Sequence, residues 1–252
     1  MKLKIIYEDN NVIVIDKPAG IAAHPRDEHD KSETIASLLY ALYPEIKNVG
    51  DNAIRPGIVH RLDKETSGLM VVAKNNETFY ELKKLFQERK IEKKYIALVS
   101  GMMEKDRGVI ETELVKIGTR TSVRHSRESG NPELGPSSNT SGFPIGSGMT
   151  TYTRRNKSAV TEYKVTKRYK EYTLVEVTPK TGRQHQIRVH FASINHPIAC
   201  DKLYGRKAKK CPSGLRRHFL HASYLKFRLK NALMEFDSEL PQDLETALLN
   251  LE

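Results

Sequence analysis

The sequence predicts an α+β fold, because strand-like and helix-like segments both recur along its 252 residues. Apolar runs at 5–7 and 12–15 flank the polar residues 8–11, a pattern that predicts a β-hairpin. Residues 34–43 and 77–89 carry apolar side chains at helical spacing, which predicts two amphipathic helices. A chain of this length can bury a substantial hydrophobic core, as one large domain or two small ones.

The remaining elements follow from the same patterns. A short helix is expected at 183–193 and a closing helix at 240–251, where Pro241 supplies the start. β-branched or alternating apolar residues predict further strands at 58–60, 69–73, 94–99, 109–115, 159–167, 172–177 and 220–229.

One segment, 118–156, lacks this periodicity. Within it, residues 127–148 are rich in Ser, Gly, Asn and Pro, a composition typical of flexible chain. A loop of this length is unusual inside a compact domain. We therefore expect a single domain over 1–252, with a poorly ordered insertion between two of its strands.

The charge balance favours an anionic partner. Lys and Arg total 42 against 31 Asp and Glu, a formal charge of +11, so the candidates are nucleic acid and a membrane surface. No apolar run is long enough to span a bilayer, and acidic residues interrupt the N-terminus, which is unlike a signal peptide. We expect no membrane partner and a cytoplasmic location. Cys200 and Cys211 are expected to be free thiols, as suits a reducing compartment.

The segment HRLDKETSG, residues 60–68, has the character of an active-site loop. An isolated aspartate between strands is most often a turn former or a surface charge. Here Arg61 and Asp63 are two positions apart, so they face the same side of an extended chain. The polar loop at 66–68 would hold the Asp63 carboxylate in place.

Two further segments carry aromatic and cationic side chains. In KKYIALVSG, residues 93–101, Tyr95 is either packed within the sheet or a platform for stacking a base. In TGRQHQIRVH, residues 181–190, a glycine precedes a short helix with Arg183 and Arg188. The helix is either a solvated basic face or a site where Arg183 pairs with a carboxylate and its neighbours meet phosphate. The nearby histidines are expected to be structural or to contact a nucleic-acid backbone rather than to be catalytic: His185, His190 and His196.

Together with DKPAG at 16–20 and DKLYG at 201–205, these motifs closely resemble the RluA family of pseudouridine synthases. The resemblance covers residues 6–230 apart from the insertion. It implies a long, bent, mostly antiparallel sheet with flanking helices and a central active-site cleft. It also implies the activity of an RNA pseudouridine synthase, an isomerase that converts uridine to pseudouridine.

The resemblance implies roles for four side chains. Asp63 would be the catalytic aspartate, and Tyr95 would stack on the target base. Arg183 would form a salt bridge with Asp63, and Arg61 would contact the RNA near the extruded base. The isomerisation neither gains nor loses atoms, so no cofactor is expected. The sugar carbon develops positive charge, and Asp63 would either attack that carbon or remove a proton from its neighbour.

The chain departs from the family pattern at two places. Cys200 stands where members have Gly, and 118–156 replaces a short basic hairpin that touches RNA. Larger members also begin with a small RNA-binding domain, which we do not expect here because the first predicted strand starts at residue 5.

Several alternatives remain open at this point. Large-subunit (23S) ribosomal RNA is the favoured substrate, with transfer RNA as the other choice. A non-catalytic RNA-binding protein of the same fold is disfavoured, because binding needs no carboxylate in a basic cleft. A monomer is expected, since no exposed apolar helix seam is visible. No metal is expected, because the possible zinc ligands lack close paired spacing: Cys200, Cys211, His218 and His221.

Overall fold

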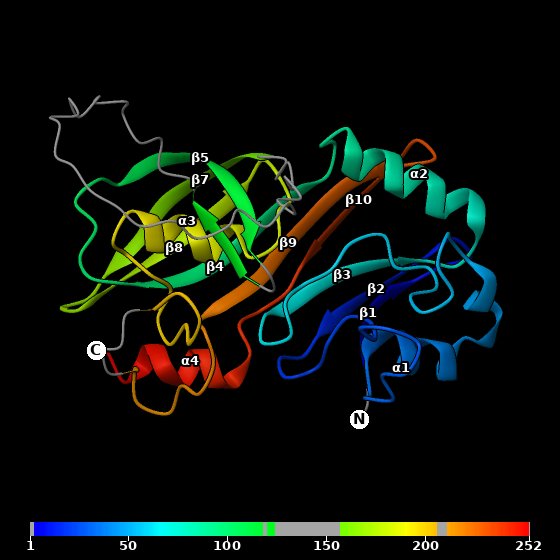
Figure 1. Ribbon diagram of the computed structural model, residues 1–252, viewed down its shortest axis with the longest axis horizontal. Helices are drawn as coiled ribbons and strands as arrows, with labels where there is room; N and C mark the ends of the chain where they lie inside the picture. The colour runs from blue at the N-terminus through cyan, green and yellow to red at the C-terminus, as the bar shows by residue number, and fades with distance from the viewer. Residues whose placement is uncertain (1–2, 118–119, 124–156, 206–210, 252) are drawn as a thin grey trace, which may run out of the picture.

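One long sheet runs through the computed structural model, which describes residues 3–117, 120–123, 157–205 and 211–251 (Figure 1). The strands follow the spatial order β1-β2-β3-β9-β4-β8-β7-β5-β6, and β10 pairs with β9. Their bounds are β1 Lys4–Glu8, β2 Val12–Lys17, β3 Ser67–Ala73, β4 Glu92–Ser100, β5 Arg107–Ile117, β6 Arg120–Val123, β7 Lys157–Arg168, β8 Tyr172–Pro179, β9 Leu220–Leu229 and β10 Ala232–Asp237.

The sheet narrows where β3 meets β9. These two strands run parallel and pair only through Ser67 with His221 and Gly68 with Ala222, a contact we call the β3–β9 junction. The other pairs of described strands are antiparallel. β9, the long orange strand in Figure 1, lies between β1–β3 and the group of β4, β5, β7 and β8. The expected α+β fold with a mostly antiparallel sheet is confirmed.

Helices pack against both parts of the sheet. Their bounds are α1 Ile35–Leu42, α2 Asn76–Gln87, α3 Gln186–Ser193 and α4 Gln242–Leu249, with a 3₁₀ helix, η1, at Pro44–Asn48. α1 begins with a capping box, in which Thr34 and Ser37 each accept a hydrogen bond from the other's main-chain N–H. α1 and α2 share a core with β2, β3 and β9, whereas α3 packs through Ile187 and Phe191 on β4 and β8. α4 buries Leu244 and Ala247 beside Phe219.

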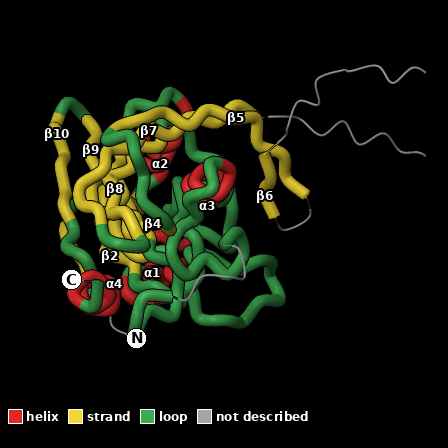
Figure 2. The backbone as a smooth tube through the Cα atoms, turned by 90° about the vertical axis from the view of Figure 1, so that its left-hand side faces the viewer, coloured by secondary structure: helices red, strands yellow, loops and turns green. Residues whose placement is uncertain are grey.

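Most predicted elements are present, but the 3₁₀ helix η1 was not predicted and three strands differ from the expectation. The strand expected at 58–60 is wrong, because Ile58 forms only an isolated bridge with Val72. β10 was not predicted. β6 lies at the start of the segment expected to be a loop, and with β5 it reaches beyond the rest of the sheet (Figure 2). The poorly ordered insertion was expected over 118–156, of which 118–119 and 124–156 lie outside the described residues.

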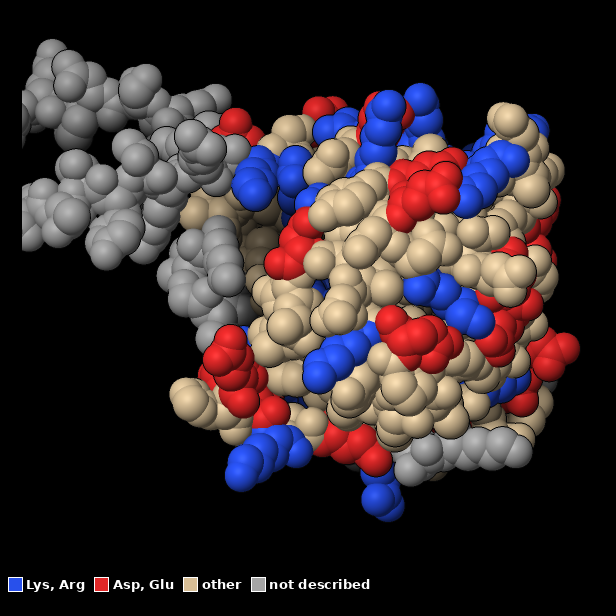
Figure 3. All heavy atoms as spheres, turned by 90° about the vertical axis from the view of Figure 1, so that its right-hand side faces the viewer, with Lys and Arg blue, Asp and Glu red and all other residues tan. Residues whose placement is uncertain are grey.

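Charged side chains of both signs are mixed on the face shown in Figure 3, which is the right-hand side of Figure 1. Lys and Arg alternate there with Asp and Glu, so this face presents no continuous basic surface.

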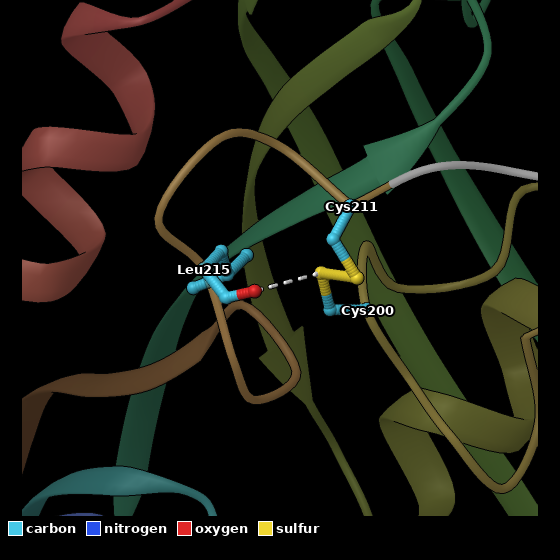
Figure 4. The surroundings of a disulfide bond; sticks show 3 residues. All are labelled: Cys200, Cys211 and Leu215. Carbon is cyan, nitrogen blue, oxygen red and sulfur yellow. Dashed lines mark hydrogen bonds between the residues drawn. A yellow bond between two sulfur atoms is a disulfide. The ribbon is translucent and has the colours of Figure 1, made fainter.

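The two cysteines form a disulfide, so the expectation of free thiols is wrong (Figure 4). The Cα atoms of Cys200 and Cys211 are 5.1 Å apart, and Cys200 Sγ lies 3.7 Å from the carbonyl oxygen of Leu215. The fold brings the two residues side by side although they are 11 positions apart, a proximity that the sequence spacing alone does not reveal. Cys200 has a φ of 60°, in the left-handed region that favours glycine.

Candidate active site

A cleft beside the β3–β9 junction consists of two adjoining hollows, of about 750 and 470 Å³. Asp63 lines both. The larger hollow also contains Tyr95, whereas the smaller one contains His24 and Cys200. Four other residues are shared by the two hollows: Arg61, Leu62, His185 and Arg188. Asp63 therefore stands at the boundary, where groups in either hollow can meet it.

The Asp63 loop is fixed by the polar residues that follow it. The main-chain N–H of Thr66 donates to the carbonyl oxygen of Asp63 at 3.0 Å, and the Thr66 hydroxyl meets His218 Nε2 at 2.8 Å. Gly68 has a φ of 116°, and a side chain there would collide with the main chain of Ala222 across the β3–β9 junction. The Thr-Ser-Gly sequence thus turns the chain tightly into β3.

Arg217 and Lys17 hold the same loop from behind. Arg217 donates to the carbonyl oxygen of Glu65 at 3.1 Å and binds Asp243 of α4 through two nitrogens. The fully buried Lys17 Nζ donates to the carbonyl oxygens of Pro18, Ile21 and Lys64. Burial lowers the pKa of Lys17 to about 7. The DKPAG motif therefore supports the candidate active-site loop from inside the protein.

Arg188, and not Arg183, forms the ion pair with Asp63. Its Nη1 donates to Asp63 Oδ2 at 2.9 Å, while Nε and Nη2 donate to the two oxygens of Asp201 at 2.7 and 2.8 Å. Burial opposes the charge on Asp201, but the Arg188 hydrogen bonds outweigh it and hold the pKa of that carboxyl below its usual range. The prediction that Arg183 pairs with Asp63 is corrected accordingly.

The correction follows from where α3 begins. His185 precedes the helix with a left-handed φ of 55°, so Arg183 lies in the loop ahead of the first turn. The Arg183 main-chain N–H donates to Gln186 Oε1 at 3.0 Å, and its Nε contacts the carbonyl oxygen of Ser158 at 3.5 Å. Its side chain lines the larger hollow. In the sequence, Arg188 lies between the apolar residues Ile187 and Val189, and this was the signal that could have indicated a buried charge pair. In the structure all three residues are buried.

Tyr95 reaches the cleft from β4. It pairs with Ala222 of β9 next to a register shift between Lys94 and Tyr95, so it stands across β9 from the β3–β9 junction. The ring is half-buried and lines the larger hollow with Asp63. Burial, and then the charge of Asp63, raise the pKa of Tyr95, so the phenol is neutral at physiological pH.

Arg61 is exposed and lines both hollows, on the same side of the chain as Asp63. Its Nη1 donates to Nε2 of His24 at 3.3 Å, and His24 Nδ1 donates to the carbonyl oxygen of Pro25 at 2.6 Å. Most of this side chain's donors remain available to a ligand. The cleft carries many more cationic residues, namely Arg26, Lys64, Lys83, Arg89, Lys93, Lys180, Arg183, Lys202, Arg216 and Arg217.

The described residues hold no cluster of three His, Cys, Asp or Glu side chains arranged to bind a metal ion. Within the same residues, no helix combines the length and the apolar character needed to cross a bilayer. The cleft is therefore a basic groove with the ion-paired carboxylate of Asp63 at its centre, and the aromatic ring of Tyr95 lines the same hollow. A basic groove around an ion-paired carboxylate is suited to an enzyme that acts on nucleic acid.

Comparisons with known proteins identify the class. Residues 11–193 match the family described as RNA pseudouridylate synthase. An uncharacterized RNA pseudouridine synthase of Aquifex aeolicus is 38% identical over 99% of this chain and 73% of its own length. Ribosomal large subunit pseudouridine synthase D of Borreliella burgdorferi is 36% identical over 98% of this chain and 68% of its own. The structure of human RNA pseudouridylate synthase domain containing 4 aligns with a TM-score of 0.72 and 26% identity, covering 98% of this chain and 92% of that one.

The chain belongs to the RNA pseudouridylate synthase family, in its RluA-type branch. It is an isomerase that acts on RNA.

Proposed function

We propose that Asp63 is the catalytic residue of this RNA pseudouridine synthase. The observation that carries the proposal is its ion pair with Arg188, at 2.9 Å, where the two hollows of the cleft meet. The Asp63 side chain is only 19% exposed, and the Arg188 guanidinium supplies the opposite charge that compensates for its removal from bulk water. A charged carboxylate can attack the electron-poor ribose carbon or remove a proton from its neighbour.

Tyr95 is proposed to retain the uracil once its bond to the ribose is broken. The ring lies in the larger hollow with Asp63, and the neutral phenol has no charge that would require solvation. Stacking holds a base by its face and leaves its edges free, so the detached uracil can turn before it rejoins the sugar.

Arg61 and Arg183 are proposed to bind the RNA around the extruded nucleotide. Both line the larger hollow, and neither has an ion pair with a carboxylate among the described residues. Their charge is therefore available to phosphates. Arg61 lies closest along the chain to Asp63, where it can occupy part of the space that an everted base leaves and offset some of the unstacking cost.

Large-subunit ribosomal RNA is the proposed substrate, which the name of the Borreliella burgdorferi relative supports. We propose that the protein acts in the cytoplasm, as a monomer, through one catalytic domain and without a cofactor.

The decisive experiment compares wild type with Asp63→Asn on ribosomal and transfer RNA taken from cells that lack the gene. We expect wild type to form pseudouridine in ribosomal RNA, and Asp63→Asn to bind that RNA with unchanged affinity and form none. Turnover by Asp63→Asn would overturn the role of the aspartate. Modification confined to transfer RNA would overturn the substrate but leave the mechanism standing.

A further inference from the structure

The two oxygens of the Asp63 carboxylate have different neighbours. Arg188 binds Oδ2 at 2.9 Å, whereas His185 Nε2 lies 3.7 Å from Oδ1. Both side chains are largely buried, with 13% of His185 and 9% of Arg188 exposed. Among the described residues, no other charged side chain is within ion-pair distance of this carboxylate. Oδ1 is therefore the oxygen directed away from Arg188, and an imidazole sits beside it.

Hydrogen bonding fixes which nitrogen of His185 carries the proton. The Tyr204 hydroxyl accepts from the main-chain N–H of Thr121, on β6, at 3.0 Å. It also lies 2.8 Å from His185 Nδ1. The hydroxyl hydrogen is then free to be donated to Nδ1, which places the imidazole hydrogen on Nε2. The opposite tautomer would direct the Nε2 lone pair at a carboxylate oxygen, which is electrostatically unfavourable.

The His185 ring is neutral at physiological pH. Burial is the main cause that lowers the pKa of His185 below its usual value. Four charged groups face the ring and partly cancel: Asp63 and Asp201 raise its pKa, whereas Arg188 and Arg61 lower it. Tyr204 adds an edge-on ring contact at 5.6 Å.

We propose that His185 is a positioning residue for this reaction, whose Nε2–H, fixed by the Tyr204 hydroxyl, orients Oδ1 of Asp63 toward the ribose. The inference rests on the proposed role of Asp63. Arg188 alone leaves the carboxylate free to rotate about its Cβ–Cγ bond. At 3.7 Å, His185 Nε2–H is too far from Oδ1 for a hydrogen bond, so it acts on this oxygen by electrostatic attraction across the cleft and favours one plane of the carboxylate. A small misplacement of a reacting group can cost a factor of about 100 in rate.

The test uses the full-length protein and measures kcat and KM on the RNA substrate for three variants. His185→Ala removes the donor, His185→Gln replaces it with an amide N–H, and Tyr204→Phe keeps the ring but removes the hydroxyl. We expect kcat to fall about 10- to 100-fold in His185→Ala and Tyr204→Phe, with KM within twofold of wild type. His185→Gln should recover most of the loss. His29→Gln, at an exposed position outside the cleft, is the matched control and should behave as wild type.

The pH dependence of kcat separates positioning from a general structural role. Protonated His185 would form a full ion pair with Asp63 and hold the carboxylate back, so wild type loses activity as the pH falls through the histidine pKa. His185→Gln cannot protonate, so its acid limb should move to lower pH. Tyr204→Phe leaves Nδ1 without its donor and makes it easier to protonate, so its acid limb should move to higher pH.

Full activity in His185→Ala would overturn the inference, and so would acid limbs that coincide in wild type, His185→Gln and Tyr204→Phe. Asp63→Asn, measured in parallel, distinguishes a failure of the inference about His185 from a failure of the proposed role of Asp63. If Asp63→Asn is inactive while His185→Ala is fully active, the inference fails and the role of Asp63 stands. If Asp63→Asn is itself active, the proposed function fails first. Thermal unfolding midpoints for all variants establish that each is folded.

Discussion

Asp201 accepts two hydrogen bonds from Arg188, at 2.7 and 2.8 Å, and its own side chain is fully buried. This fork fixes the plane of the guanidinium before it reaches Asp63. Because two hydrogen bonds hold the planar guanidinium, its third nitrogen, Nη1, can point in only one direction. That nitrogen points at Asp63 Oδ2. The aspartate of the DKLYG motif therefore positions the arginine that forms the ion pair with Asp63.

Arg188→Lys should reduce kcat about 100-fold, because an ammonium cannot bind Asp201 by a fork and Asp63 at the same time. Arg183→Lys is the matched comparison at a position of the same motif. It should retain most of kcat, with a higher KM, since Arg183 lines the RNA cleft but does not hold Asp63. Single-turnover rates at saturating RNA measure the difference. Equal losses of kcat in the two variants would contradict the assignment of the ion pair.

Tyr95→Phe should retain at least 10-fold more activity than Tyr95→Leu. The phenylalanine keeps the ring face, and stacking on a base contributes about 1–3 kcal/mol. The hydroxyl has no hydrogen-bond partner among the described residues, so its removal leaves no buried group unsatisfied. Rates of pseudouridine formation measure this, with RNA affinity as the control. Similar activities in the two variants would exclude a stacking role.

The stability of the protein should fall as the pH drops from 6.5 toward 4. Burial lowers the pKa of His60 to about 3, and burial lowers the pKa of His190 and of His218 to about 4. Unfolded histidine titrates near 6.5, so the unfolded chain binds more protons than the folded one between these values. Three such groups correspond to ~4 kcal/mol per pH unit near pH 5.

Urea unfolding at pH 7, 6 and 5 measures that slope. His60→Gln should lower the slope by about a third, because it removes one of the three titrating groups. The variant should stay folded, since the amide oxygen can still accept the hydrogen bond that His60 Nε2 takes from the main-chain N–H of Val71. His29→Gln serves as the exposed control and should leave the slope as in wild type. A free energy of unfolding that stays constant over this pH range would show that these histidines are not buried in neutral form.

Alkylation tests the disulfide between Cys200 and Cys211. Protein denatured without reductant should take up no thiol reagent, and protein denatured with reductant should take up two equivalents, one for each cysteine of the chain. Intact mass reports both numbers. Two equivalents without reductant would mean that the cysteines are free in the purified protein.

Cys200→Gly should be more stable than Cys200→Ala by about 1 kcal/mol, because glycine adopts a φ of 60° without the steric cost of a β-carbon. Both variants lose the disulfide, so the difference in their stabilities reports the cost of the left-handed backbone conformation at this position. Urea unfolding of the two variants measures the difference. Equal stabilities would show that the chain at this position relaxes out of the left-handed region.

Local elements were predictable from the sequence because their periodicity is local. The first hairpin, α2 and β9 all follow from apolar spacing. The strand at 58–60 was wrong because its few apolar residues pack on β3 without extending the sheet. β6 and β10 were missed because they are short strands whose character depends on their neighbours.

The candidate site was predictable only in part. Motifs located Asp63, Tyr95 and Arg61, which do line one cleft. The partner of Asp63 was assigned to the wrong arginine, since the left-handed residue before α3 shifts the helix start and carries no usual capping signal. Which of two arginines meets an aspartate more than a hundred positions away is decided by packing, and a motif does not contain that information.

The narrow β3–β9 junction has a consequence for the timing of activity during protein synthesis. A nascent chain that has emerged only as far as β4 already carries Asp63 and Tyr95, yet it has neither the guanidinium of Arg188 nor the strand that joins the two parts of the sheet. The carboxylate would then be unrestrained and in water. If Asp63 acts as proposed, competence to isomerise a nucleotide arises only once translation has passed β9, and an unfinished polypeptide would not modify RNA.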